Sequence, residues 1–139
     1  MAKKKAERHD NAEWEVLFYR DEKEREPVQE FLRSLDTRAQ ARLIWSIEQL
    51  RVRNISARYP LVEHIEGDIF ELREESSTNI YRILYVLYIG RRIVLLHGFQ
   101  KKTQKTPKRE IELARRRAAD VQRFIIELEK GREEAEKET

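Results

Sequence analysis

The sequence contains no cysteine and no long run of apolar residues. Without cysteine, the chain can form no disulfide framework and offers no thiolate nucleophile. No stretch approaches the roughly 20 apolar residues that a membrane-spanning helix needs. Residues 1–5 lead into no apolar run, so a secretory signal is not expected. These absences predict a single-domain protein of the reducing cytoplasm that has no membrane contact.

Motifs for common cofactor and metal chemistry are also missing. There is no glycine-rich dinucleotide motif, no phosphate-binding P-loop and no nucleophile elbow. The three histidines, His9, His64 and His97, are scattered and lack the spacing of metal ligands. We therefore expect neither a metal site nor a cofactor.

Negative charge is absent from one long window. From Ser76 to Arg109 there is no aspartate or glutamate, while eight lysines and arginines occur. The whole chain has a net charge of only +3, so the remaining residues are net negative. This segregation indicates a site for a phosphate or another polyanion. The alternative is a basic loop that is simply solvated, because blocks of like charge are common on protein surfaces.

Apolar spacing predicts the elements of the N-terminal half. Trp14, Val16 and Phe18 alternate with Glu13 and Glu15, which favours a strand with one buried face. Pro27 suits the first position of a helix, and Thr37 with Gln40 would form a capping box for a second helix. The two helices should form an antiparallel hairpin. Residues at helical spacing form the buried stripe expected for the second helix: Ala39, Leu43, Ile44, Trp45, Ile47 and Leu50.

Three strands are predicted next. After a loop over residues 54–66, strands are expected over residues 67–73, 80–89 and 92–99, joined as an antiparallel meander. The last of these strands is apolar on both faces, so we expect it at the centre of the sheet.

A C-terminal helix completes the predicted fold. Thr106 would cap it, Pro107 would occupy its first position, and Gly131 would end it. We expect disordered tails, basic over residues 1–12 and acidic over 131–139, around a domain spanning 13–130. The predicted fold class is α+β, an antiparallel sheet made of the N-terminal strand and the meander, in the order β-α-α-β-β-β-α.

Two arginines are the first candidate site residues. Arg73 and Arg82 lie on neighbouring predicted strands, so their side chains can meet across the sheet. Arg82 sits in an apolar strand, where a charge needs a partner or a cleft. One interpretation is a pair of guanidinium groups that binds phosphate. The other is a buried salt bridge from Arg82 to Glu71 or Glu75.

The segment after the last strand adds positive charge. Lys101 and Lys102 leave the strand end, and the N-terminus of the following helix would add positive potential. His97 precedes this segment, with the parity of Leu95 and Phe99. It is interpreted either as a core histidine or as a general acid or base.

Residues 68–73, 81–85 and 97–107 together resemble the RelE/ParE toxin superfamily, most of all its HigB-like, phage-derived branch. The resemblance covers residues 14–128 in element order. It implies a RelE-like fold and the toxin half of a type II toxin–antitoxin system. Such toxins are mostly ribosome-dependent endoribonucleases that cleave mRNA; the alternatives are a ParE-like gyrase poison without nuclease activity and an inactive regulatory relative.

The resemblance also implies residue roles. Arg73, Arg82, Lys101 and Lys102 match the family's catalytic basic residues. The residues expected to bind RNA are Gln100, Thr103, Gln104, Lys105, Thr106, Lys108 and Arg109. RelE has lysines where this chain has Ile69 and Glu71, and its catalytic C-terminal tyrosine has no equivalent after Tyr88. The general base is therefore left open.

The partners that the resemblance implies are the ribosome, its mRNA and a cognate antitoxin, often a helix-turn-helix, HigA-like protein. Operator DNA would be bound only through that antitoxin. The uncompensated positive charge favours an acidic or amphipathic antitoxin segment. This segment could block the basic residues directly or dock on the opposite side.

Overall fold

The computed structural model describes residues 14–53, 62–76, 78–101 and 105–138, so the basic tail predicted for residues 1–12 lies outside the described part. The strands are β1 (Glu15–Phe18), β2 (Val62–Glu66), β3 (Ile69–Ser76), β4 (Asn79–Tyr88) and β5 (Arg92–Lys101). The helices are α2 (Pro27–Arg33), α3 (Thr37–Arg53), α4 (Lys108–Ala119) and α5 (Val121–Glu138).

The strands form one mixed sheet in the order β1-β5-β4-β3-β2. Strands β2 to β5 pair antiparallel with their neighbours, whereas β1 lies parallel to β5. The prediction of a wholly antiparallel sheet is therefore wrong at β1. Alternating polarity fixes which face of a strand is buried, but not its direction beside a partner that is distant in the sequence. Strand β5 lies between β1 and β4, which confirms its predicted central position.

Strand β2 was not predicted, because the sequence indicated a loop over residues 54–66. It pairs antiparallel with β3 through a turn in which Gly67 has a φ of 52°. Glu63 and His64 of β2 are exposed, so this edge strand has little apolar alternation that could have revealed it. The element order is therefore β-α-α-β-β-β-β-α-α rather than β-α-α-β-β-β-α.

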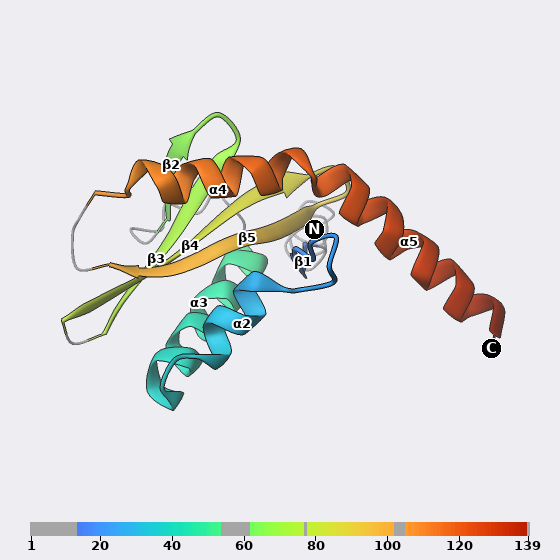
Figure 1. The fold of residues 1–139 in the computed structure, drawn as a ribbon. Coiled ribbons are helices and arrows are strands. Elements are labelled where there is room, and N and C mark those ends of the chain that lie inside the picture. The colour runs from blue at the N-terminus through green and yellow to red at the C-terminus, as the bar shows by residue number, and fades with distance from the viewer. Residues whose placement is uncertain (1–13, 54–61, 77, 102–104, 139) are drawn as a thin grey trace, which may run out of the picture.

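Helices cover both faces of the sheet (Figure 1). Helices α2 and α3 pack on one face, where Leu43 and Leu50 meet Leu72 and Ile83. Helix α4 and the start of α5 pack on the other face in a second core, which includes Leu84, Val86, Leu96, Ala114, Val121 and Phe124. The sheet is thus the middle of three layers, and side chains on its two faces belong to separate cores.

A β-bulge in β5 decides which core each of its residues enters. Leu84 pairs with His97, but the next residue, Tyr85, pairs with Leu95, so Leu96 is the extra residue. Leu95 therefore packs under α2 and α3, whereas Phe99 packs under α4. The expected shared parity of His97 with Leu95 is wrong, and its shared parity with Phe99 is confirmed.

Helix α3 begins differently from the prediction. Asp36 Oδ1 accepts a hydrogen bond of 2.8 Å from the backbone N–H of Ala39, so Asp36 provides the side-chain cap. The side chain of Gln40 reaches back to the carbonyl of Leu32 instead of closing a box with Thr37. The predicted capping box is wrong because an aspartate, one residue earlier, already satisfies the free N–H group.

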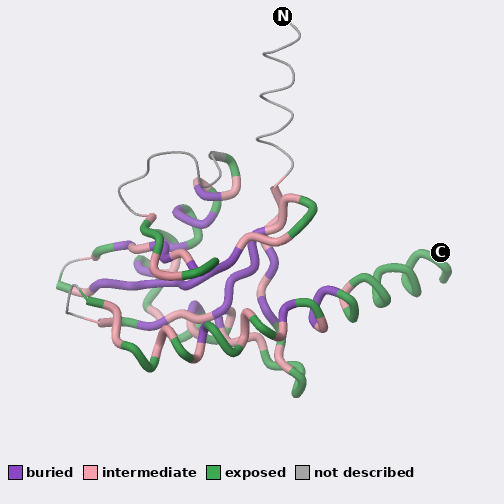
Figure 2. The backbone as a smooth tube through the Cα atoms, turned by 90° about the horizontal axis from the view of Figure 1, so that it is seen from above, coloured by how far each residue is buried: buried purple, intermediate pink, exposed green. Residues whose placement is uncertain are grey.

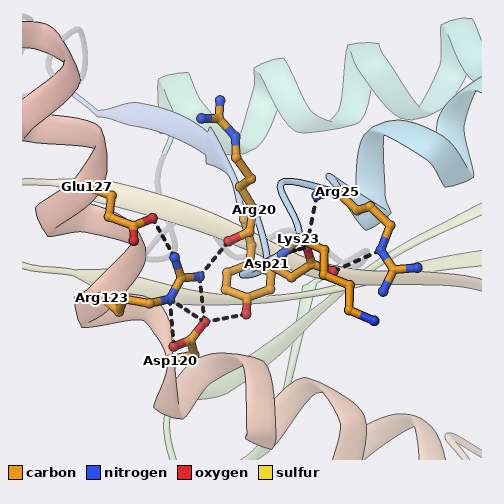
Figure 3. A network of polar contacts seen from close by, with 8 residues as sticks. Arg20, Asp21, Lys23, Arg25, Asp120, Arg123 and Glu127 are labelled. Atoms are coloured by element: carbon orange, nitrogen blue, oxygen red, sulfur yellow. Dashed lines mark hydrogen bonds and ion pairs between the residues drawn. The ribbon is translucent and has the colours of Figure 1, made fainter.

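The predicted single C-terminal helix is interrupted at Asp120, which separates α4 from α5. Asp120 accepts a 2.6 Å hydrogen bond from the Tyr19 hydroxyl and also binds the Arg123 guanidinium (Figure 3). Arg123 donates in turn to the carbonyl of Arg20. Hydrogen bonds from Arg123 lower the pKa of Asp120, and burial together with the bond to this carboxylate raises the pKa of Tyr19 to about 12. The network therefore joins the helix break to the segment after β1.

Helix α5 does not end at Gly131 as predicted. It continues to Glu138, and its last turns are exposed and extend away from the sheet (Figure 2). Arg132 forms an ion pair with Glu15 of β1, and Arg92 forms another with Glu129. These pairs hold the middle of α5 against one edge of the fold. The division into a domain over residues 13–130 with a separate acidic tail remains a prediction.

Gly98 of β5 permits the close approach of α2. A Cβ atom at this position would lie 2.3 Å from Cδ2 of Phe31, whereas a Cβ atom at Gly131 would have no heavy atom within 4 Å. We predict that Gly98→Ala lowers the free energy of unfolding by about 1–3 kcal/mol through overpacking. The matched variant Gly131→Ala should raise it by roughly 0.5–1 kcal/mol, because alanine is the better helix former.

Urea denaturation of both variants measures these changes. Equal stability of Gly98→Ala and the wild type would show that α2 does not pack this closely on β5.

Candidate anion site

Arg73 and Arg82 project from the face of the sheet that α4 covers. They are register partners in the β3–β4 pair, and Arg82 is also the register partner of Phe99 in β5. Cross-strand partners share one face of a sheet, and Phe99 belongs to the core beneath α4. The predicted juxtaposition of the two arginines is therefore present.

Arg82 is fully buried and has defined polar partners. Its Nη1 donates a 2.8 Å hydrogen bond to the hydroxyl of Thr106 and lies 3.4 Å from Oε2 of Glu71. The Thr106 hydroxyl donates to the same Glu71 oxygen over 2.5 Å. Glu71 is itself 0% exposed. The buried salt bridge considered for Arg82 is thus present, with Glu71 as its partner, whereas Glu75 is exposed.

Thr106 takes part in this cluster instead of capping α4. Pro107 occupies the N-cap position, no side chain caps the helix, and the helix begins at Lys108. The predictions of Thr106 as cap and of Pro107 as the first helical residue are wrong. The hydroxyl that would have capped the helix instead joins the start of α4 to β3 and β4.

Arg73 is the accessible guanidinium of the pair, with a side chain that is 23% exposed. Its Nη2 atom lies 3.2 Å from a Glu63 carboxylate oxygen and 3.4 Å from Oε1 of Glu71. Glu71 therefore pairs with both arginines, one through each oxygen. Glu63 is largely exposed, so its attraction for Arg73 is screened by solvent.

Described basic residues of β5 and of the start of α4 lie near this cluster. Lys101 is half-buried and lies two residues beyond Phe99, on the same face of the strand. Lys105, Lys108 and Arg109 are exposed, and Lys108 and Arg109 occupy the first turn of α4 next to Thr106. The predicted site residues Lys102, Thr103 and Gln104 lie outside the described residues.

Gln100 is the predicted RNA-binding residue that lies apart from the others. It is the register partner of Tyr81, whose side chain packs in the core beneath α2 and α3. Its amide donates a 2.8 Å hydrogen bond to Asn79. Gln100 therefore lies on the opposite face of the sheet from Arg82.

His97 lies on the α4 face and is held at both ring nitrogens. Arg117 Nη1 donates to Nδ1 over 3.2 Å, so Nε2 carries the proton and donates to Glu110 over 2.7 Å. Burial lowers the pKa of His97; Glu110 opposes this shift, and the charge of Arg117 adds to it. Arg117 also donates to the carbonyl of Leu96, the bulge residue. The arrangement matches a neutral, hydrogen-bonded histidine, and a role in proton transfer stays a prediction.

The cluster presents one partly exposed guanidinium group, that of Arg73. Guanidinium groups are suited to phosphate because they offer several donors in one plane. The described residues include no group of three or more His, Asp or Glu side chains arranged to hold a metal ion. No helix within the described ranges is long and apolar enough to cross a membrane.

The central position of Glu71 and the role of Arg117 were not recognised from the sequence. Glu71 appeared only as one of two possible partners of Arg82 and as a departure from RelE. A signal was present, since Glu71 and Arg73 are two residues apart on one strand and so share a face. Arg117 gave no such signal, because three consecutive arginines in a helix usually lie in solvent.

More than half of the chain is similar in sequence to known proteins. Residues 30–119 match the family model described as "Phage derived protein Gp49-like (DUF891)", a range that includes Arg73, Arg82 and Thr106. Proteins named "Probable endoribonuclease HigB1" from two Mycobacterium tuberculosis strains, CDC 1551 / Oshkosh and ATCC 25618 / H37Rv, are each 38% identical over 80 residues. The match covers 58% of this chain and 62% of each relative, so it spans less than two thirds of their length.

The buried ion pair yields a prediction on stability. Arg82→Ala removes the fully buried arginine of the two that pair with the buried Glu71 carboxylate, and we expect a loss of about 3–5 kcal/mol in the free energy of unfolding. Adding Glu71→Gln removes the stranded charge, so the double variant should lose roughly 1–3 kcal/mol less than the sum of the single variants. Arg132→Ala, at the exposed pair with Glu15, is the control and should cost at most about 1 kcal/mol.

Chemical denaturation of the four variants gives the coupling energy. Additive losses would show that Arg82 and Glu71 do not depend on each other.

The environment of His97 yields a prediction on pH. Because its pKa in the folded protein lies below the usual 6.5, the unfolded chain binds a proton more readily. Stability is therefore full above about pH 7 and falls as the pH drops below 6.5. In His97→Gln, the amide can still donate to Glu110 and accept from Arg117, without titrating. We expect this variant to lose less stability than the wild type between about pH 7 and pH 5.

Urea unfolding at the two pH values tests this expectation. An equal loss in both proteins would exclude His97 as the titrating group.

Proposed function

Because this chain belongs to the Gp49-like family of phage-derived proteins, we propose that it is the toxin of a type II toxin–antitoxin system and cleaves messenger RNA. The similar proteins from Mycobacterium tuberculosis carry the name of an endoribonuclease, which supports the proposed reaction class. The fold alone would not distinguish a nuclease from a gyrase poison, because one fold can host both. The residues of the site therefore have to distinguish the two activities.

The observation that carries the proposal is the buried Glu71–Arg82–Thr106 cluster with Arg73 at its accessible side. A buried ion pair is costly to desolvate and contributes little net stability compared with apolar packing. Here it fixes two guanidinium groups on one face, beside the end of β5 and the start of α4. A preorganised positive site of this kind suits a reaction in which negative charge develops on phosphate oxygens.

In the proposed reaction, RNA supplies its own nucleophile. The 2′-oxygen attacks the adjacent phosphorus and loses its proton, and the bond from phosphorus to the 5′-oxygen breaks. The 5′-oxygen takes up a proton, which leaves a 2′,3′-cyclic phosphate and a free 5′-hydroxyl. No divalent metal is needed for this displacement, and we propose that the protein works without one.

The exposure of each basic residue suggests its role. Arg73 reaches solvent, so we assign the direct phosphate contact to Arg73. Arg82 is fully buried, so it acts by holding Glu71 and Thr106 in place and by adding positive potential in a low-dielectric setting. Lys101 and Lys102 hold the RNA backbone or protonate the leaving oxygen. The donors from Lys105 to Arg109 extend the RNA-binding surface.

We also propose that cleavage takes place on the ribosome. Both nitrogens of His97 are engaged, so the strongest candidate base on this face is not poised to accept a proton. A weak base suffices where the ribosome aligns the 2′-oxygen with the phosphorus, because orientation alone supplies several kcal/mol. The proposed partners are the ribosome with its mRNA and a cognate antitoxin, through which alone operator DNA is bound.

A cleavage assay with translating ribosomes tests the proposal. We predict that the wild-type protein produces new mRNA ends and that Arg73→Gln lowers the rate by about 10²–10³-fold, because it removes a donor to the transition state. Arg33→Gln makes the same charge change at an exposed position in α2 and should cleave like the wild type. Cleavage should persist with EDTA at magnesium levels that still hold the ribosome together.

Three results would contradict the proposal. They are intact mRNA with the wild-type protein, wild-type cleavage by folded Arg73→Gln, and inhibition of DNA gyrase in place of mRNA cleavage.

A further inference from the structure

The outer face of α3 carries an unusual share of exposed apolar side chains. Among the described residues, the large apolar side chains that are exposed number five, and three of them lie on this helix: Ile44 at 53%, Trp45 at 54% and Val52 at 38%. Ile44 and Trp45 were expected to widen the buried stripe, but the core is formed by the opposite side of α3. Trp45 and Val52 are seven residues apart, which is two helical turns, so they lie on one side of α3.

A groove adjoins this face. It has a volume of about 220 Å³ and lies between α3 and β1, lined by Val16, Phe18, Ile44, Ile47, Glu48 and Arg51. This space can hold one large apolar side chain. Strand β1 is an edge strand of the sheet, so the groove opens at the side of the fold. Ile44 contributes to both the exposed face and the groove, which makes them one continuous surface.

The surface is bordered by positive charge. Arg38, Arg42 and Arg51 are spaced along α3, and Glu48 is the acidic side chain within the helix. Arg51 pairs with Glu48, and Arg42 pairs with Glu74 of β3 while remaining 52% exposed. An occupant that is apolar in the middle and acidic at its edges would complement both the apolar residues and the excess of arginine.

This surface lies on the opposite side of the sheet from the candidate anion site. Helix α3 packs over the face that holds Leu72 and Ile83, whereas Arg82 projects into the α4 layer. The two helical layers are separated by the sheet (Figure 1). A partner bound to α3 would therefore leave Arg73 and Lys101 uncovered.

We propose that the outer face of α3, with the α3–β1 groove, is the docking surface for an amphipathic, acidic helix of the antitoxin. This inference rests on the proposed function and deepens it, because it places the antitoxin on the side away from the anion site. Trp45 is the anchor, since exposed tryptophan side chains are frequent binding hot spots. A partner helix would present its apolar side chains to this surface at three- and four-residue spacing. The antitoxin then acts by preventing the toxin from fitting on the ribosome, not by filling the site.

The test uses the full chain and the purified product of the neighbouring reading frame. The variant carries Ile44→Glu and Trp45→Glu, two exposed positions at which added charge should leave the fold intact. Ile126→Glu is the matched control, because Ile126 is 46% exposed and lies on α5 in the other layer. We expect the double variant to bind roughly 30-fold or more weakly, as for loss of an interface hot spot. The control should stay within about 2-fold of the wild type.

Cleavage by the same preparations separates this inference from the proposed function. The double variant should cleave mRNA like the wild type. Co-expressed antitoxin should no longer relieve its inhibition of growth. Binding of the folded double variant with wild-type affinity would overturn the docking surface. The proposal would also be overturned if the chain alone formed a dimer that the double substitution dissociates, because the occupant of the surface would then be a second copy. Surface-dependent binding without wild-type cleavage would overturn the nuclease proposal and leave the docking surface standing.

Discussion

The shared carboxylate of Glu71 is the interaction on which the site side of this fold depends. A buried charge is tolerated only where partners compensate for lost hydration, and Glu71 obtains them from three segments: Arg73 of its own strand, Arg82 of β4, and Thr106 before α4. These contacts fix the start of α4, and Asp120 fixes its end through Tyr19. Between them, His97 and Leu96 hold Arg117. Helix α4 is thus positioned by polar contacts along its length, while the small side chain of Ala114 lets it approach the sheet closely.

The sheet divides the molecule into two sides with different chemistry. On the α4 side lie the arginine pair, the half-buried Lys101 and the first turn of α4, which suit a polyanion. On the α3 side, exposed apolar side chains, Trp45 and Ile44, lie beside the α3–β1 groove and are bordered by arginines. Such a division allows one protein to bind RNA and a partner protein without overlap. In the proposed arrangement, the bound partner makes the complex too large to fit on the ribosome. This steric inhibition requires no conformational change in the toxin.

Sequence reasoning recovered what local patterns encode. The meander, the helical hairpin, the central β5 and the pairing of Arg73 with Arg82 follow from alternation and short connections. It failed where long-range contacts decide. The parallel pairing of β1, the polar strand β2, the bulge at Leu96 and the break at Asp120 each depend on partners far away in the chain. Thr106 is of a type that often caps helices, but its hydroxyl instead bonds to Glu71 and Arg82. Trp45 is exposed because only the opposite side of α3 faces the core. The family resemblance named the arginines, but only the structure shows that one is buried and the other accessible.

The most direct test of this account is the structure of the protein on a ribosome whose mRNA carries a 2′-deoxy nucleotide at the cleavage position, so that the RNA remains intact. The account predicts that the phosphate at this position contacts the Arg73 guanidinium, while the Nη1 of Arg82 keeps its bonds to Glu71 and Thr106. A phosphate inserted between Arg82 and Glu71, with the carboxylate displaced, would contradict the organising role given to that buried pair.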